Sequence, residues 1–425
     1  MLANLFARLV PVRPGETTPM LLATAHGFCI LFAFYLLRPV RDEIGAADRG
    51  NLQLLWTAVF VVMLLAVPLY SLAVARLRRG VFIPLVNRFF ALNLVAFYAA
   101  LVLLPEAARP WIDRIFYVWL SVFALFVVAV FWGLVVDLFR DDQGRRLFGF
   151  ITAGSSLGGI AGSASTAVLA PHVPVFLLLL AAVLPLEAAA WLARAIARRA
   201  DDAPGTLNRE PAAPIGGSAW SGMVAVFRSP QLRNIALWIL LMTFASTILY
   251  FVQSHLVGEA IADRALRRAF LARIDLAVNV VTVVTQTALT ARIVRRLGVA
   301  ATLSLLPAVA ALGFAALGAA PAALALTALL VVRVLYDSSR HALAKPAREV
   351  LFTHLGREQR YKSKAFIDAA VYRGGDLLSG WIYAGLAAAG MTAGAIALSA
   401  APVAVWWALL GRRLGWGERG TDRPE

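Results

Sequence analysis

The sequence contains very little cysteine, lysine or histidine, and these shortages exclude several classes of protein. Its 425 residues include one cysteine, Cys29, so a single chain cannot build a disulfide framework or a thiolate metal site. The five histidines are scattered without the paired spacing of metal ligands, and we expect neither a metal nor another cofactor. The phosphate-binding pattern G-x-x-x-x-G-K-[ST] is also absent, which argues against an ATP-hydrolysing pump.

Apolar residues, in contrast, are far in excess of what a soluble protein carries. They make up 60% of the chain, whereas about 45 to 50% is typical of soluble domains. A membrane-spanning helix needs roughly 20 apolar residues, and such runs recur from end to end. We therefore predict an all-α membrane protein of about twelve transmembrane helices, the first at 20–37 and the eleventh at 366–386.

The net charge of +16 could indicate nucleic-acid binding. In a membrane protein, however, the first explanation of basic residues is their enrichment in cytoplasmic loops. If the N-terminus is cytoplasmic, 26 of the 40 basic residues fall in inner loops and tails. This bias is typical of cytoplasmic loops. We predict a multi-pass protein of the bacterial inner membrane with both termini in the cytoplasm, and no nucleic-acid partner.

The spans divide into two groups of six, separated by a polar stretch rich in Pro, Gly and Arg. The prediction is an N-terminal half at 1–191, a cytoplasmic linker at 192–229 and a C-terminal half at 230–425. A shift of 216 residues supports this division, because it places the pair at 158–159, both Gly, on the pair at 374–375, also both Gly. Two halves of one topology are typical of the major facilitator fold.

Ionisable residues at membrane depth cost roughly 2.5 to 3.5 kcal/mol each on insertion scales, so clusters of them are candidate functional groups. The first span ends in LLRPVRDEIG, which carries Arg38, Arg41, Asp42 and Glu43 within two helical turns. Two interpretations remain open. The charges could neutralise one another in an outer interfacial anchor, or the arginines could bind a substrate phosphate while Asp42 acts as a gate.

The end of the fourth span carries a second acidic candidate. Asp137 follows a run of apolar and small residues at the membrane edge, where the positive-inside bias explains neighbouring arginines but not an acid. We predict a gating or coupling role for it. The next span contains GSSLG at 154–158, which formally matches a hydrolase nucleophile elbow. That motif needs a strand, a turn and a helix, so we expect no enzyme here.

All the lysines of the chain lie in one inner loop after the tenth span. They are Lys345, Lys362 and Lys364, against 37 arginines over the whole length. A compact, mobile charge suits phosphate recognition, although three residues can also cluster by chance on a basic loop.

Further charges fall on single faces of the predicted helices. Asp368, Arg373 and Asp376 lie close to one face just inside the eleventh span, and Arg373 and Asp376 have the spacing of a helical ion pair. Asp275 and Asn279 share a face of the eighth span. These groups could pair for structural reasons or line a transport path.

Together these motifs resemble the nucleotide translocases, a family of ATP:ADP antiporters related to major facilitator proteins. The segment LRPVRDEI at 37–44 is similar to an LRDTKD-like stretch, which puts Arg41 where that family has a substrate-linked lysine. The segment FWGLVVDLFRDDQGRRLFG at 131–149 is similar to a stretch that begins FWGFANE, which puts Asp137 at the position of a functional glutamate.

The third matching segment, KSKAFID, is similar to the family's KGKAAID stretch. The resemblance places Lys362 and Lys364 on two family lysines and Arg348 on the lysine of a Lys-Glu pair. The sequence departs from the family around Tyr250, where no acid is present. The resemblance therefore implies family membership more firmly than it implies ATP and ADP as substrates.

These observations predict a secondary transporter that exchanges nucleotides or related phosphate-bearing anions by alternating access. Substrate contacts are expected from Arg38, Arg41, Arg348, Lys362, Lys364 and Arg373. Gating or coupling is expected from Asp42, Asp137, Asp275, Asp368 and Asp376. We expect a monomer surrounded by membrane lipid. The alternatives are a carrier of another amphipathic or lipid-linked metabolite, and a non-transporting membrane scaffold or sensor.

Overall fold

The structure is a computed structural model of the chain. It describes residues 12–13, 15–76, 79–139, 141–202, 221–352, 363–364 and 366–417, which contain helices and no strand. The expected interfacial helix at the N-terminus lies outside these residues. By their contacts the helices form two compact units, each of which is described separately below.

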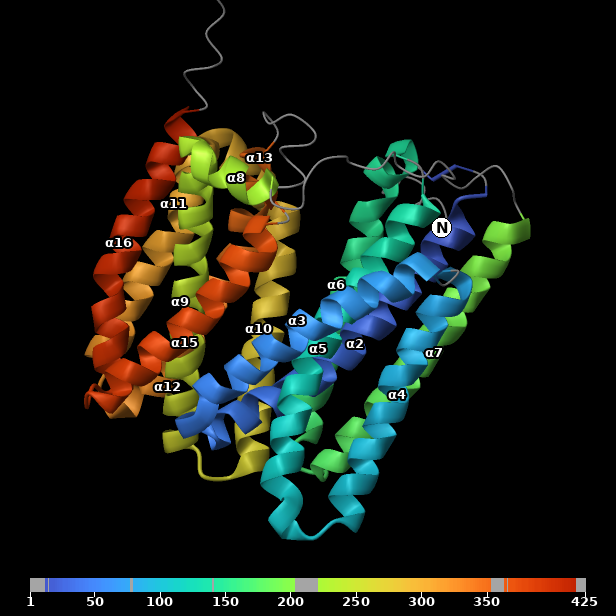
Figure 1. The fold of residues 1–425 in the computed structure, drawn as a ribbon, viewed down its shortest axis with the longest axis horizontal. Coiled ribbons are helices and arrows are strands. Elements are labelled where there is room, and N and C mark those ends of the chain that lie inside the picture. Colours follow the sequence, from blue (N-terminus) through green and yellow to red (C-terminus); the bar gives the residue numbers. More distant parts are fainter. Residues whose placement is uncertain are drawn as a thin grey trace, which may run out of the picture. The chain divides into compact units, whose positions relative to one another are not determined.

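Unit 1 comprises 1–45, 61–212 and 263–276. Its helices are α2 (Thr17–Ala47, up to residue 45), the second part of α3 (Leu52–Arg76), α4 (Arg79–Leu103), α5 (Arg109–Leu138), α6 (Asp141–Leu169), α7 (Val175–Asp202) and the first part of α10 (Arg264–Ala288). Helices α4 and α7 pack side by side along their length (Figure 1).

Unit 2 comprises 46–60, 213–262 and 277–425. It contains the start of α3, the rest of α10, and α8 (Ser221–Arg228), α9 (Pro230–Ala260), α11 (Thr290–Ala319, kinked at Gly298), α12 (Ala325–Ser339), α13 (Lys345–Val350), α15 (Tyr372–Ala388) and α16 (Ala393–Gly417). Two π-helical turns interrupt the regular helices at η4 (Arg340–Ala344) and η5 (Ile367–Val371).

Eleven helical stretches of the described chain are long and apolar enough to cross a membrane. The eleventh helix of the prediction corresponds to η5 and α15 together, which are less apolar because they carry Asp368, Arg373, Asp376 and several glycines. Large apolar side chains such as Leu64, Leu103 and Leu184 are strongly exposed. An all-helical chain with exposed apolar faces is what a lipid environment requires, since helices satisfy their own backbone hydrogen bonds.

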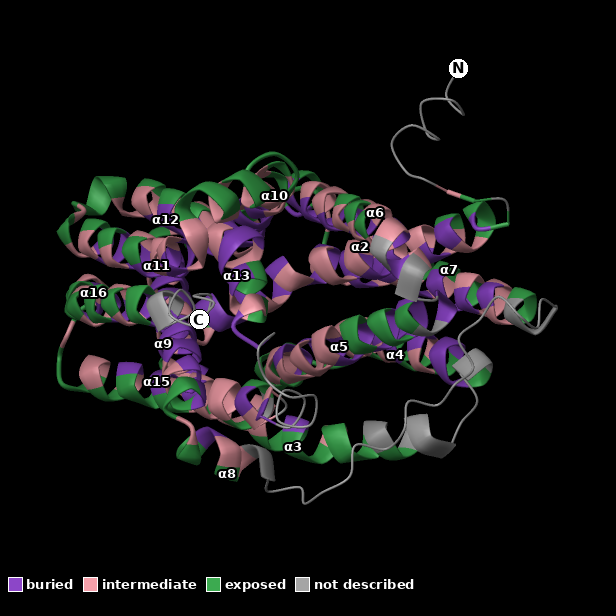
Figure 2. Cartoon of the chain, turned by 90° about the horizontal axis from the view of Figure 1, so that it is seen from above, coloured by how far each residue is buried: buried purple, intermediate pink, exposed green. Residues whose placement is uncertain are grey.

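Helix α9 forms the buried centre of unit 2. It carries no Asp, Glu, Lys or Arg between Arg233 and Glu259, and a predominantly apolar helix of that kind is stable only when other helices surround it. Of its most apolar stretch 78% is buried, which is visible as the purple run of α9 in Figure 2. Helices α12, α15 and α16 pack against it, so polar residues on α9 face the interior of the unit.

In unit 1, a stripe of small residues brings α6 very close to α2. A Cβ atom added at Gly158 would lie 2.2 Å from the backbone oxygen of Phe28, and one added at Gly162 would lie 2.4 Å from that of Phe32. The Thr166 hydroxyl donates to the Leu36 carbonyl at 2.8 Å. This close packing fixes the rotation of α2, and therefore the direction of its charged residues.

The start of α2 is tied to α6 by a buried carboxylate outside the membrane-spanning stretch. Glu16 accepts hydrogen bonds from Arg146 at 2.8 Å, from Gln143 at 3.1 Å and from the Arg13 amide at 2.9 Å. Burial by itself raises the pKa of Glu16, but these hydrogen bonds outweigh it and hold the pKa below its ordinary value.

Candidate functional site

The charged run at 38–43 lies inside α2 rather than beyond its end. The predicted span stops at Leu37, whereas the helix continues through Pro39 to Ala47. Proline removes one backbone donor and disturbs the turn before it, yet this segment is helical, and Val40 and Ile44 beyond the proline are buried. Asp42 and Glu43 are buried, and the side chains of Arg38 and Arg41 are each 18% exposed.

Four of the predicted residues come together in unit 1. Arg38 Nη1 lies 3.1 Å from Asp275 Oδ1 on α10, and Arg38 Nε lies 3.7 Å from Asp42 Oδ2. Arg41 Nη2 donates to Asp42 Oδ1 at 2.7 Å. We name Arg38, Arg41, Asp42 and Asp275 the α2 cluster. It balances two guanidinium groups with two carboxylates, and Arg38 connects α2 to α10.

Aromatic rings lie beside both arginines of the α2 cluster. The guanidinium carbons of Arg38 and Arg41 lie 5.6 Å from the ring centres of Tyr35 and Tyr117, respectively. A guanidinium can stack on such a ring and still donate in its plane, in the fork geometry that fits carboxylate and phosphate.

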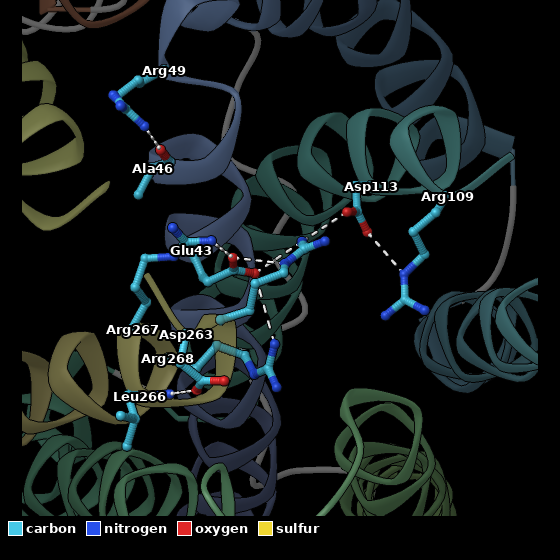
Figure 3. A network of polar contacts seen from close by, with 10 residues as sticks. Glu43, Ala46, Arg49, Arg109, Asp113, Asp263, Leu266, Arg267 and Arg268 are labelled. Atoms are coloured by element: carbon cyan, nitrogen blue, oxygen red, sulfur yellow. Dashed lines mark hydrogen bonds and ion pairs between the residues drawn. The ribbon is translucent and has the colours of Figure 1, made fainter. Parts of the chain in front are cut away.

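A second network in unit 1 centres on Glu43, which the sequence prediction left out of the functional set. Its carboxylate accepts from Arg264 Nε at 2.9 Å and from Arg267 Nη2 at 3.0 Å, and Arg268 Nη1 lies 3.8 Å away. Arg264 also donates to Asp113 on α5 at 2.7 Å (Figure 3). The spacing of the three arginines at one end of α10 is the sequence signal that could have identified this network.

Three more predicted residues come together in unit 2. Arg348 Nη1 donates to Asp368 at 3.2 Å and Arg348 Nη2 donates to Glu349 at 3.0 Å, while Lys364 also donates to Glu349. These contacts connect α13 to the residues around η5. The carboxylates are well exposed, so water screens this group of charges more strongly than the α2 cluster.

The remaining predicted pair in unit 2 is looser. Arg373 Nη1 lies 3.8 Å from Asp376 Oδ2, as the helical spacing predicted, and Asp376 also accepts from the Thr247 hydroxyl at 3.0 Å. Close to it, Arg340 donates to Ser246 at 2.7 Å and to the Tyr372 hydroxyl at 3.0 Å. Arg340, Ser246 and Tyr372 were missed. The prediction ended the tenth span before Arg340 and placed this arginine in a basic inner loop, whereas the structure continues the helix through η4 to Val350.

Two predicted residues cannot be compared with the structure. Lys362 and the side chain of Asp137 lie outside the described residues, although the backbone at 137 belongs to α5. Within the described part of the chain, His, Cys, Asp and Glu side chains nowhere gather in a group of three that could hold a metal ion.

No protein-family model matches the sequence, and no curated protein matches it closely. Solved structures do match its fold over nearly the whole length. A nucleoside transporter, NupG, has a TM-score of 0.59 at 12% identity and covers 95% of this chain and 100% of its own.

Two further solved structures show the same similarity. A bacterial homologue of the human lysosomal transporter Spinster has a TM-score of 0.60 at 13% identity, covering 96% of this chain and 98% of its own. A peptide transporter of the POT family has a TM-score of 0.61 at 14% identity, covering 96% and 99%. At such identities the similarity concerns the fold, and the chain is a multi-pass helical membrane protein with the major facilitator fold.

Proposed function

We propose that this protein is a secondary transporter that exchanges phosphate-bearing anions, such as the nucleotides ATP and ADP, by alternating access. The observation that carries the proposal is the α2 cluster, in which Arg38 holds a carboxylate on α2 and another on α10. Transporters of different substrates share this fold, so the nature of the cargo is argued from the charged groups.

Substrate binding would exchange the partners of the two arginines. A phosphate group offers several charged oxygens to a guanidinium fork, as the carboxylates of Asp42 and Asp275 do. With side chains 18% exposed, Arg38 and Arg41 are open enough for an anion to approach. A bound phosphate would take the place of Asp275 and release the contact between α2 and α10.

This exchange of partners explains why the carrier would be an exchanger. Separating buried charges without a replacement is costly, because each is left without its partner in a medium of low dielectric. The empty carrier would keep Arg38 on Asp275, whereas a loaded carrier would not. A substrate that neutralises the charge of Arg38 therefore favours the conformational change. The size of the effect is set by the difference between the affinities of the substrate for the two states.

The test is uptake of labelled ATP or ADP into proteoliposomes that contain unlabelled nucleotide. We expect uptake that requires internal nucleotide, and a loss of at least about tenfold in Arg38→Gln and Asp275→Asn, which corresponds to roughly 1.4 kcal/mol. Arg273→Gln is the matched control, because this arginine lies on α10 beside Asp275 but is exposed.

The same assay separates the alternatives. Uptake of neutral nucleosides that does not require an internal anion would show that the protein is another kind of carrier and not an anion exchanger. Absence of any uptake by folded, reconstituted protein would contradict transport of these solutes and favour a lipid-linked cargo or a scaffold. Normal exchange by Arg38→Gln would remove the α2 cluster from the mechanism.

A further inference from the structure

Two π-helical turns in unit 2 are connected by one side-chain contact. Segments η4 and η5 are the π-helical segments of the described residues, and Arg340 at the start of η4 donates to Tyr372, the residue after η5, at 3.0 Å. A π turn holds an extra residue and weakens the backbone ladder, so it persists mostly where function requires it. In transporters, irregular helices commonly surround the binding site.

The hydrogen-bond partners of Arg340 are unusual for a half-buried cation, because they are uncharged. Its two terminal nitrogens donate to the hydroxyl groups of Ser246 on α9 and Tyr372 on α15. Its closest carboxylate, that of Asp337, lies 3.8 Å away and pairs with Arg333 at 2.9 Å. Arg340 therefore has a longer contact to a carboxylate, which it shares with Arg333, than Arg38 has to its carboxylate partner at 3.1 Å.

The charges around Arg340 are also unbalanced in number. Arg333, Arg340 and Arg373 face two carboxylates, those of Asp337 and Asp376, through the ion pairs within this group. The side chain of Arg340 is 17% exposed, about as much as that of Arg38 at 18%. A surplus cation inside a membrane protein is costly, and a bound anion is one way in which the cost is offset.

Three hydrogen-bond donors around this cation have no acceptor among the described residues. The Ser246 and Tyr372 hydroxyl oxygens accept from Arg340, and each still has its own hydrogen to donate. The Nε–H group of Arg340 is buried without a partner. Other arginines, such as Arg333, also have a buried Nε–H group without a partner, so the two hydroxyl groups are what distinguishes this site. A cation flanked by hydroxyl donors is the complement of an oxyanion.

We propose that Arg340, Ser246 and Tyr372 form an oxyanion-binding site in unit 2, which receives a phosphoryl or carboxylate group of the cargo. This proposal rests on the proposed function in taking the cargo to be an anion. Arg340 supplies the charge, and the two hydroxyl groups and Nε–H donate to the oxygens of the anion. The three residues belong to α9, η4 and α15, so a bound anion bridges three elements of the unit.

Two measurements on the purified full-length protein test this site. The first is the thermal midpoint in detergent with and without pyrophosphate, since a ligand that binds only the folded state raises the midpoint. The second is ATP/ADP exchange in proteoliposomes. The variants are Arg340→Gln and the double variant Ser246→Ala/Tyr372→Phe. Arg295→Gln is the matched control, because this exposed arginine of unit 2 donates only to the Ala291 carbonyl of its own helix.

The site predicts a midpoint increase with pyrophosphate in the natural chain and in Arg295→Gln, and none in Arg340→Gln. The double variant keeps the charge of Arg340 but loses two hydroxyl donors, so its apparent affinity for pyrophosphate should fall on the order of tenfold to a hundredfold. If Arg340→Gln does not fold, the double variant tests the site instead, and an apparent pyrophosphate affinity equal to that of the natural chain would overturn it.

The outcomes separate the two proposals. Pyrophosphate stabilisation that depends on Arg340, without nucleotide exchange, would support the oxyanion site and contradict the proposed exchanger. Exchange by the natural chain that persists in Arg340→Gln and in the double variant would overturn the site and leave the exchanger intact. Absence of pyrophosphate stabilisation in the natural chain would also overturn the site.

Discussion

Glu43 shows how a single carboxylate can hold several buried cations. Its side chain is 1% exposed and contacts guanidinium groups of Arg264, Arg267 and Arg268 (Figure 3). Removing one partner of a buried ion pair costs about 3 to 5 kcal/mol, chiefly because it leaves charge without compensation. The stability of unit 1 therefore depends on this residue more than on any exposed acid.

Glu43→Gln should lower the thermal unfolding midpoint of the purified protein by several degrees, since at least about 3 kcal/mol is lost. The amide keeps the shape of the side chain but removes its charge. Glu106→Gln, an exposed acid of the same unit, is the control and should leave the midpoint unchanged. Equal midpoints for the two variants would show that the arginines do not need Glu43.

The functional candidates at the residue scale were predictable only in part. Arg38, Arg41, Asp42 and Asp275 were selected because a charge in an apolar run is conspicuous, and the structure brings these four together. Arg340 was not selected, since nothing local distinguishes it from its basic neighbours. Its importance comes from Ser246 and Tyr372, which are 94 and 32 residues away in the chain.

At the scale of elements, the contact between α2 and α6 depends on the absence of side chains. Gly158 lies against the backbone of Phe28, so that even a methyl group there would meet backbone atoms rather than a side chain that could move. Small residues give membrane helices this closeness, since van der Waals contact replaces the hydrophobic effect as the main attraction.

Gly158→Ala should force α2 and α6 apart and destabilise the protein by roughly 1 to 3 kcal/mol, the usual cost of overpacking. Gly149→Ala is the matched control on the same helix, because nothing lies within 4 Å of its added methyl group. It should be neutral or slightly stabilising, since alanine favours a helix over glycine by about 1 kcal/mol. The comparison is made by thermal unfolding in detergent, and a control as unstable as Gly158→Ala would contradict the explanation.

At the scale of the whole molecule, the distribution of basic residues predicts an orientation in the membrane. The inner loops and tails of the predicted topology hold 26 of the 40, the asymmetry expected on the cytoplasmic side. Glu106 is then placed outside and Arg228 inside, and both are exposed in the described structure.

Cysteine labelling tests this orientation. In a Cys29→Ser background, a membrane-impermeant maleimide should label Glu106→Cys in intact spheroplasts and Arg228→Cys only after the membrane is opened. The parent without cysteine is the control for background labelling. The reverse pattern would invert the topology, and would move the predicted cytoplasmic loop of the three lysines to the outside.

The amino-acid sequence alone determined the class of this protein and the charged positions that needed an explanation. Its prediction of about twelve membrane helices compares with eleven suitable stretches among the described residues. These properties follow from local composition, because roughly 20 apolar residues in a row are enough to favour the membrane over water. The continuation of α2 through Pro39 was not predictable in this way, since proline and a run of charges locally favour the end of an apolar helix.

Only the tertiary structure decided which charges meet. It joins Arg38 to Asp275 and Glu43 to Arg264 over more than two hundred residues, and it gives Arg340 two hydroxyl groups as its hydrogen-bond partners. Ion pairing depends on distance and on the dielectric of the surroundings. Both are properties of packed helices, which the order of residues along the chain does not express.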